Sequence, residues 1–382
     1  MTELITSQVD QMVALRQTLH RAPEISGQEC ETAQRIATML HSAGADRVIT
    51  SLGGHGVAGE FRGQADGPTV LIRCELDALP IAEISDLPYR SLVPGTAHLC
   101  GHDGHMSIVM AVALALSQKR PSNGRVVLLF QPAEETGAGA SAVISDPKYA
   151  EIRPNYAFAL HNVPGWPLGL TRLADGVANC ASRGMRIAFT GKTSHAAAPE
   201  DGISPAPAMA KLMAELAQLG TGGTLNEEFA LSTLTHVRLG EATFGISPGE
   251  GELLVTLRSV TNAKMDALMN AAKTCVANAA GNLTSSISWH DVFPASVNAN
   301  EAVALVKAGA TRNGIQAELM SHPMQWSEDF GHFGRDETKA AMIFLGSGID
   351  QPQLHNPDFD FPDALIPQGA NLFLGIIRHI LG

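Results

Sequence analysis

One short segment of the sequence concentrates side chains that can bind metal ions. The stretch HLCGHDGHM, residues 98–106, contains three histidines, one cysteine and one aspartate. The whole chain has only five cysteines and fourteen histidines, so this density is unusual. Cys100 and His102 flank one glycine, and a tight turn there would bring both side chains to one site. The segment is either a crowded structural turn or part of a metal site, and the rest of the chain distinguishes the two.

Four β-rich runs each end close to further candidate residues. The runs are TVLIR (69–73), GRVVLLF (124–130), YAFAL (156–160) and AAMIFLG (340–346). The side chains that follow them are Glu75, Asp77, Glu134, Glu135, His161 and His355. Continuous apolar runs of this kind are typical of strands buried on both faces of a sheet. Ligands of open α/β sheets bind beyond the carboxyl ends of strands, so we expect these side chains to meet at one edge.

Five residues form a candidate ligand set for divalent metal ions. They are Cys100, His102, Glu135, His161 and His355. Thiolate, imidazole and carboxylate together suit Zn²⁺ or Mn²⁺ better than Mg²⁺ or Ca²⁺, which prefer shells made of oxygen. Two ions sharing five ligands would leave coordination positions open, as metal-assisted hydrolysis requires. Each residue alone has an ordinary explanation, such as a buried thiol or a solvated acid, but their joint position at strand ends favours a site.

The adjacent acids offer the division of roles that hydrolysis needs. Neighbouring side chains point in different directions, so one carboxylate can bind metal while the other faces the attacking water. We assign Glu134 as the general base and Glu135 as the ligand, although spacing alone does not order them.

The elements around these residues predict an α/β protein with an inserted domain. Helical patterns at about 31–43, 106–118, 303–312 and 369–381 separate the strand candidates, which favours a mixed, largely parallel sheet covered by helices. Between about residues 183 and 291 the expected order becomes β-α-β-β-α-β, typical of a compact α+β domain. A chain of 382 residues also exceeds what one hydrophobic core usually supports.

Composition excludes several classes of partner. The formal net charge of −12 argues against nucleic acid, because phosphate binding needs a concentrated basic face. No apolar run reaches the roughly 18–20 residues that span a bilayer, so no membrane partner is expected. The N-terminal residues lack the pattern of a signal peptide, and the five cysteines are scattered rather than arranged as a disulfide framework. We therefore predict a cytoplasmic protein that acts on a small molecule.

Seven segments together resemble a known family. The chain contains, in this order, RCELDALP, HLCGHDGHM, QPAEE, LHNVPGWPLG, GKTSHAAAPEDGISP, SEDF and LHNPDF. The same order is found in bimetallic N-acyl-amino-acid amidohydrolases, such as hippurate hydrolases and indole-acetyl-amino-acid hydrolases. This group lies within the wider aminoacylase and carboxypeptidase family of metallopeptidase-like enzymes. The resemblance extends from about His20 to the C-terminus, and the CGHDGH and SHAAAP blocks are its most specific parts.

The resemblance implies an architecture and a role for each candidate residue. It implies a homodimer or higher oligomer, with residues 1–182 and 293–382 as the catalytic domain and residues 183–292 as a lid and dimerisation domain. It also implies that the five candidate ligands hold two metal ions and that Glu134 is the catalytic base. Asp77 matches an acid that orients a ligand histidine. His195 matches a residue that hydrogen-bonds the oxyanion in a neighbouring active site, and Arg258 matches one that meets a substrate carboxylate.

Two positions depart from the pattern of the family. Glu75 stands where the family usually has aspartate, and Gly245, in ATFGISPGE, replaces an asparagine that helps to bind substrate. Recognition of the amino-acid half of the substrate is therefore expected to differ from that of the usual enzymes.

The predicted reaction is hydrolysis of the amide in N-acetyl, N-benzoyl or aryl-acetyl amino acids, by attack of a metal-bound water assisted by Glu134. The nearest alternative is a dipeptidase or carboxypeptidase that uses the same machinery. A third possibility is a silent protein that binds an amino-acid conjugate. The complete set of ligands, Glu134 and His195 argues against the third, because binding alone does not require them.

Overall fold

The computed structural model describes residues 4–382, which divide into two compact units. The first unit comprises the chain up to Ala178 together with Ser296–Ser321 and Asp329–Gly382. The second unit comprises Asn179–Ala295 and the short segment His322–Glu328. This short segment lies in the part of the sequence assigned above to the catalytic domain. It belongs to the second unit because its backbone pairs there, with the amide of Cys180 donating to the carbonyl of Met324 at 3.1 Å.

The first unit is built on an eight-stranded sheet with the order β1-β2-β4-β3-β5-β16-β6-β15. The strands are β1 (Arg47–Leu52), β2 (Gly56–Arg62), β3 (Ala65–Glu75), β4 (Asn123–Gln131), β5 (Tyr156–Pro164), β6 (Thr171–Leu173), β15 (Ala317–Leu319) and β16 (Lys339–Gly348). The four central strands β4, β3, β5 and β16 run parallel to one another. Strand β2 pairs antiparallel with both β1 and β4, and β6 pairs antiparallel with β16. The predicted mixed, largely parallel sheet is therefore confirmed. Strands β7 (Gly176–Asn179) and β14 (Ser296–Asn298) form a separate pair.

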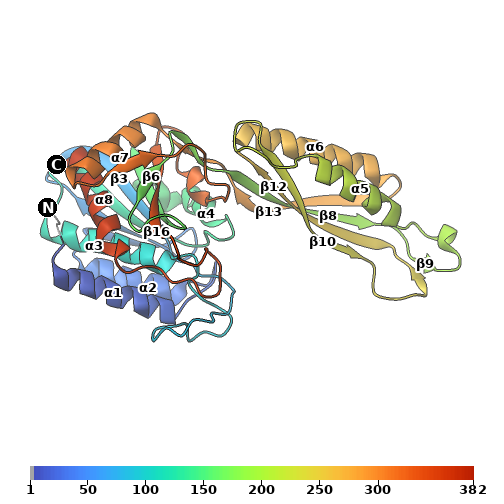
Figure 1. Cartoon of the computed structure of the whole chain (residues 1–382), viewed down its shortest axis with the longest axis horizontal. Coiled ribbons are helices and arrows are strands. Elements are labelled where there is room, and N and C mark those ends of the chain that lie inside the picture. The colour runs from blue at the N-terminus through green and yellow to red at the C-terminus, as the bar shows by residue number, and fades with distance from the viewer. Residues whose placement is uncertain (1–3) are drawn as a thin grey trace. The chain divides into compact units, whose positions relative to one another are not determined.

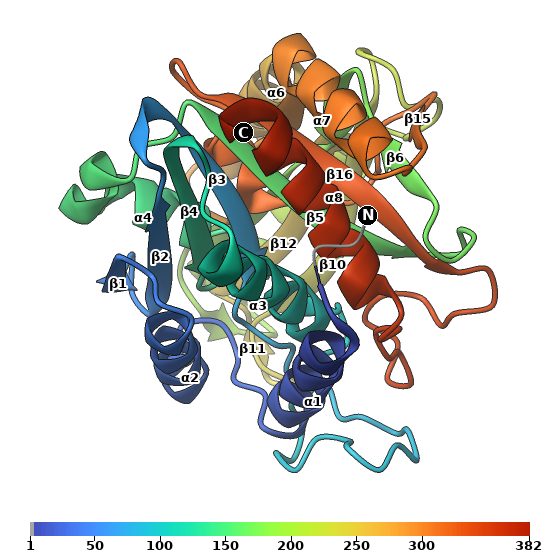
Figure 2. The same ribbon diagram turned by 90° about the vertical axis from the view of Figure 1, so that its left-hand side faces the viewer.

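Helices cover this sheet and bury its apolar strands. They are α1 (Thr6–Arg21), α2 (Cys30–Ser42), α3 (His102–Gln118), α4 (Gly139–Ser145), α7 (Asn300–Arg312) and α8 (Leu365–Leu381). Figure 2 shows α1, α3 and α8 crossing in front of the sheet. Helix α3 is buried along nearly its whole length, which fits its apolar sequence, since a helix that is hydrophobic all round belongs in a core. Among the described residues, no helix is both long enough and apolar enough to cross a bilayer.

The second unit is a four-stranded antiparallel sheet with two helices. Its strands have the order β10-β12-β8-β13 and are β8 (Ala181–Thr190), β10 (Ala230–Leu239), β12 (Glu250–Ser259) and β13 (Thr284–Phe293). Helices α5 (Ala206–Gln218) and α6 (Asn262–Ala280) lie on one face of this sheet (Figure 1). A two-residue ribbon, β9 (Ser194–His195) with β11 (Ile246–Ser247), extends from it. The element order confirms the predicted β-α-β-β-α-β pattern.

Two glycines allow helices α7 and α8 of the first unit to pack with their backbones almost touching. A Cβ atom at Gly309 would lie 2.5 Å from the backbone nitrogen of Ile376, and one at Gly375 would lie 2.2 Å from the carbonyl oxygen of Gly309. No real side chain fits such a gap, so the glycines fix the separation of the two helices.

We expect Gly309→Ala to lower the free energy of unfolding by about 1–3 kcal/mol, because the added methyl group forces two packed backbones apart. Chemical denaturation measures this change. Gly334→Ala is the matched control, since a Cβ there would make only an ordinary contact of 3.4 Å with Ala340. The control is expected to stay within about 0.5 kcal/mol of the parent protein. Equal stability of the two variants would contradict the close packing of α7 on α8.

Candidate metal centre

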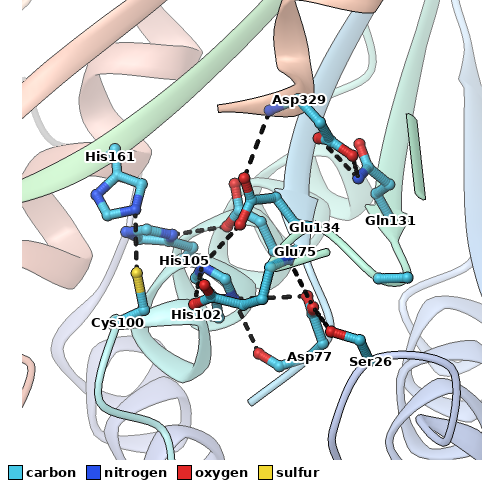
Figure 3. A network of polar contacts seen from close by, with 12 residues as sticks. Ser26, Glu75, Asp77, Cys100, His102, His105, Gln131, Glu134, His161 and Asp329 are labelled. Atoms are coloured by element: carbon cyan, nitrogen blue, oxygen red, sulfur yellow. Dashed lines mark hydrogen bonds and ion pairs between the residues drawn. The ribbon is translucent and has the colours of Figure 1, made fainter. Parts of the chain in front are cut away.

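The residues predicted to bind metal lie together at the carboxyl ends of the central strands. Strand β3 leads to Asp77, the turn after β4 carries Glu134 and Glu135, and β5 contains His161. Cys100 and His102 enter the same region at the start of α3, and His355 follows β16. Figure 3 shows Asp77, Cys100, His102, Glu134 and His161 gathered in this region. The expected convergence at one sheet edge therefore occurs, because parallel strands place their carboxyl ends on the same side.

The side chains approach one another at distances that a metal ion could bridge. Cys100 Sγ lies 3.4 Å from His161 Nε2, and His355 Nε2 lies 3.6 Å from Glu135 Oε2. His102 Nε2 is 3.9 Å from a carboxylate oxygen of Glu134 and equally far from one of Glu135. These contacts bring together every ligand candidate that the sequence suggested.

Two groups of possible ligands share the cysteine. The ligand atoms of Cys100, His102 and His161 all lie within 4.8 Å of one another, and the same holds for those of Cys100, Glu135 and His355. If each group held an ion, both ions would therefore use Cys100. The Nε2 atom of His102 is also buried with no hydrogen-bond partner among residues 4–382. A buried nitrogen in that state is costly, and a metal ion would satisfy it.

A glycine makes the approach of Cys100 to His102 possible. Gly101 has a φ of 95°, in the left-handed region that favours glycine, and it directly precedes the first turn of α3. A Cβ atom at Gly101 would lie 2.3 Å from the side-chain oxygen of Asn162. Both the backbone conformation and the lack of space therefore require glycine at this turn.

Asp77 holds His102 in the orientation that a metal ligand needs. His102 Nδ1 lies 2.8 Å from the backbone oxygen of Asp77 and 3.6 Å from its carboxylate, so this nitrogen carries the proton and Nε2 is left to bind. The carboxylate of Asp77 accepts hydrogen bonds from Ser26 Oγ at 2.7 Å and from the backbone amide of Glu135 at 3.0 Å. One buried acid thus fixes a histidine and the turn that carries the acidic pair.

The electrostatic environment of the candidate ligands favours a bound cation. Burial lowers the pKa of His161 well below its usual value, with a smaller contribution from His105, and burial also lowers the pKa of His355. For His102, burial opposes protonation, but the hydrogen bond to Asp77 and the charge of Glu75 outweigh it and raise its pKa to about 10. A field that attracts a proton so strongly also attracts a divalent ion. The donor set therefore fits a metal centre.

Glu134 is held by a second buried network. Its carboxyl group is almost fully enclosed, at 4% exposure, and accepts a hydrogen bond from the backbone amide of Asp329 at 3.4 Å. The carboxylate of Asp329 is itself bound by Arg73 at 2.6 Å. It also accepts a hydrogen bond from the side-chain amide of Gln131 at 2.8 Å (Figure 3). Asp329 opens the short helix η3 (Asp329–His332), so this network fixes the backbone that faces Glu134.

His105 is a supporting residue that the sequence did not reveal. His105 Nδ1 lies 2.7 Å from Glu75, and its Nε2 lies 2.7 Å from the side-chain oxygen of Asn162. Asn162 in turn accepts, through its backbone oxygen, a hydrogen bond from His161 Nδ1 at 2.8 Å. Glu75 therefore lies behind the ligand histidines, where it contacts both His105 and Arg73. The spacing of His105 from His102 could have indicated this supporting role, because residues three positions apart lie on the same face of a helix.

The two predicted substrate-binding residues lie in the second unit. His195 is exposed on β9, and its Nδ1 accepts a hydrogen bond from the amide of Ala197 at 3.0 Å. In the neutral ring this leaves the proton on Nε2, which is then a donor. Arg258 is half-buried on β12, where its guanidinium donates to Ser327 Oγ at 3.0 Å and to the carbonyl of Gln325 at 3.4 Å. Gly245 lies beside His195, with its carbonyl accepting from the amide of Ala196 at 3.1 Å.

We expect Asp77→Asn to weaken binding of added Zn²⁺ or Mn²⁺ by about 10- to 100-fold, because the amide no longer provides the charge that orients His102. Competition with a chelating indicator measures the affinity. Asp10→Asn changes an exposed acid on α1 in the same way and is expected to leave the affinity unchanged. Unaltered affinity in Asp77→Asn would show that this acid does not support a metal ligand.

Known proteins show the same sequence pattern and fold. The model of the peptidase family M20/M25/M40 matches residues 71–379. An N-acetyl-L-cysteine deacetylase of Bacillus subtilis is 30% identical over 374 residues, which cover 97% of this chain and 88% of that protein. A hippurate hydrolase of Campylobacter jejuni is 29% identical over 363 residues, covering 94% of each chain. A Bacillus subtilis crystal structure described as a dinuclear metal binding peptidase of the M20 family shares the fold, with a TM-score of 0.82, 24% identity and 99% of each chain covered.

These matches extend over almost the whole chain. They confirm the resemblance on which the predicted roles rest, as well as the prediction that the chain is a hydrolase. The protein belongs to peptidase family M20/M25/M40.

Proposed function

We propose that the protein hydrolyses the amide bond of N-acyl amino acids, releasing a carboxylic acid and a free amino acid. The observation that carries the proposal is the enclosed carboxylate of Glu134 beside two groups of metal-ligand candidates. Relatives along the whole chain support the substrate class, because N-acetyl-L-cysteine and hippurate are both amides of an amino acid. A dipeptidase or carboxypeptidase activity remains the alternative, since a peptide offers the same amide and carboxylate.

Two divalent ions, Zn²⁺ or Mn²⁺, are proposed as the cofactors. Cys100, His102 and His161 would hold one ion, and Cys100, Glu135 and His355 would hold the other. When bound, such ions polarise the substrate carbonyl and ease deprotonation of water. Neutral imidazoles and carboxylates suit both metals, and the thiolate adds a preference for the softer Zn²⁺.

Glu134 is proposed to move the protons of the reaction. Its carboxylate would accept a proton from the attacking water and pass that proton to the leaving nitrogen. The nearby amide of Asp329 supports this role. It donates to Oε1 of Glu134 and so orients the carboxylate, while Oε2 lies near His102. Asp77 takes part only by positioning His102 and the turn of Glu135.

His195 and Arg258 are proposed to bind the substrate. The Nε2 proton of His195 would hydrogen-bond the oxyanion, and a preorganised donor of this kind contributes roughly 3–4 kcal/mol to transition-state stabilisation. The forked guanidinium of Arg258 would pair with the carboxylate of the amino-acid half. Gly245 leaves space beside His195, since no atom lies within 4 Å of a Cβ built there. That space is the proposed reason for an altered preference for the amino acid.

We also propose that the protein works as a homodimer in the cytoplasm. Strand β10 is an edge strand, and its Val237 and Leu239 are 39% and 40% exposed, which favours coverage by another chain. Phe244 and Ile246 are also exposed, and Ile246 belongs to the two-residue ribbon of β9 and β11. The five cysteines are all free, as expected in a reducing compartment.

Elemental analysis combined with an activity panel tests the proposal. We expect close to two transition-metal ions per chain, and hydrolysis of N-acetyl, N-benzoyl or indole-acetyl amino acids in preference to dipeptides. Removal of metal by a chelator should abolish activity, and added Zn²⁺ or Mn²⁺ should restore it. A protein that stays inactive on every compound after metal is supplied would refute the hydrolase assignment, whereas a preference for dipeptides would select the alternative.

Glu134→Gln is expected to reduce kcat by at least about 100-fold while both metal ions stay bound, because the amide cannot accept the proton of water. Steady-state kinetics and metal analysis on the same sample separate these two effects. Glu31→Gln, an exposed position on α2, serves as the control and should keep full activity. Substantial turnover in Glu134→Gln would mean that another group is the base.

A further inference from the structure

A buried arginine far from the metal centre in sequence joins three acids. Arg16 of α1 is completely buried, although arginine is rarely enclosed unless it is paired. Its Nη1 atom lies 2.7 Å from Asp360 and 3.2 Å from Asp103, and its Nε atom contacts Asp363. The reaction described above uses none of these four residues, so the network needs its own explanation.

The network connects the two parts of the chain that supply ligands. Asp103 directly follows His102 at the start of α3, and Asp360 lies five residues after His355. Arg16 therefore ties the segment that carries His355 to the helix that carries His102. These segments are remote in sequence, so the contact depends on the position of α1.

The segment that carries His355 has little regular structure of its own. Residues 349–364, between β16 and α8, form turns and loops. His355 has a φ of 67°, which is strained for a residue other than glycine, and its side chain is 48% exposed. One backbone hydrogen bond, from its amide to the carbonyl of Leu99 at 2.8 Å, holds it directly. A strained, half-exposed ligand needs support from the rest of its segment.

Asp360 provides that support from both of its oxygens. Oδ1 meets Arg16, and Oδ2 accepts a hydrogen bond from the hydroxyl of Tyr89 at 2.7 Å. The ring of Tyr89 also lies 4.7 Å from the guanidinium carbon of Arg16, in cation–π contact. The neighbours Phe359 and Phe361 are completely buried. The segment is thus held by the polar contacts of Asp360 and by the two buried phenylalanine rings on either side of it.

His102, in contrast, has supports that do not involve Arg16. Its imidazole is oriented by Asp77, as described above. Asp103 also binds His20 Nδ1 at 2.9 Å and the amide of Gly104 at 2.9 Å. The start of α3 therefore keeps several contacts when the contact between Arg16 and Asp360 is lost.

We infer that Arg16 is a positioning residue for one half of the metal centre. Through Asp360 and Tyr89 it holds the segment that presents His355, and it thereby sets the affinity of the group Cys100, Glu135 and His355 for its ion. The other group, which contains His102 and His161, does not depend on this anchor. The inference rests on the proposed function, because it assumes that both groups bind metal.

Variants of the anchor test the inference by metal binding rather than by activity. Removing Arg16 would leave buried carboxylates unpaired and could prevent folding, so the partners are changed instead. Asp360→Asn is expected to retain one tightly bound Zn²⁺ per chain and to bind the second about 10- to 100-fold more weakly. Tyr89→Phe, which loses only one hydrogen bond, should weaken the same ion by a smaller factor. Titration against a chelating indicator resolves the two affinities.

Asp358→Asn is the matched control in the same segment. Asp358 is exposed, and no side-chain partner of its carboxylate lies within the described residues 4–382. This variant should bind both ions like the parent protein. Should Asp360→Asn fail to fold, Tyr89→Phe decides the question alone.

Three results would overturn the inference. The first is unchanged affinity for both ions in folded Asp360→Asn and Tyr89→Phe. The second is equal weakening of both ions, which would indicate general loosening rather than positioning of His355. The third is a parent protein that binds fewer than two ions. The parent titration alone shows this third result, so a failure of the proposed metal centre is distinguished from a failure of the anchor.

Discussion

The metal-centre edge of the sheet depends on the compensation of buried negative charge. Glu75, Asp77, Asp103 and Asp329 are all completely enclosed at this edge. An isolated carboxylate in such a place would cost far more free energy than the fold has available, so each acid must meet cations or hydrogen-bond donors. Every one of them does, and the partners determine where the ligand side chains lie.

Two arginines on different sides of the centre compensate three of these four acids, whereas Asp77 is held by His102 and hydrogen-bond donors. Arg73 of β3 binds Glu75 and Asp329, which stand behind the ligand histidines and beside Glu134. Arg16 of α1 binds Asp103 and Asp360, which lie close in sequence to His102 and His355. The candidate ligands lie at strand ends and in loops, and the buried ion pairs of the two arginines hold these segments in place. Such support matters because loosely held ligands lose metal affinity and catalytic geometry.

Close backbone packing completes this preorganisation. Gly101 lets the turn before α3 approach Asn162, and Gly104 lets the same helix meet the ring of Phe361, where a Cβ would lie 2.3 Å away. Phe361 belongs to the segment that carries His355. The helix that begins at His102 and the loop that carries His355 are therefore in direct contact.

The sequence by itself determined the elements and most of the candidate site. Continuous apolar runs identified the central strands, because burial on both faces demands them, and the metal-binding residue types at their ends identified the ligands. The single glycine between Cys100 and His102 also indicated that a tight turn could bring both side chains to one site. The family followed from the order of these motifs.

Only the tertiary structure decided which residues support the site. Arg16, His105 and Arg73 each contact a partner that is remote in sequence, namely Asp360, Asn162 and Asp329, and no local pattern specifies such contacts. The antiparallel strands at the sheet edges and the placement of His322–Glu328 in the second unit were likewise invisible in the sequence. Periodicity reports whether a residue is buried, but the identity of its partner arises only when the chain packs and each buried charge must be paired.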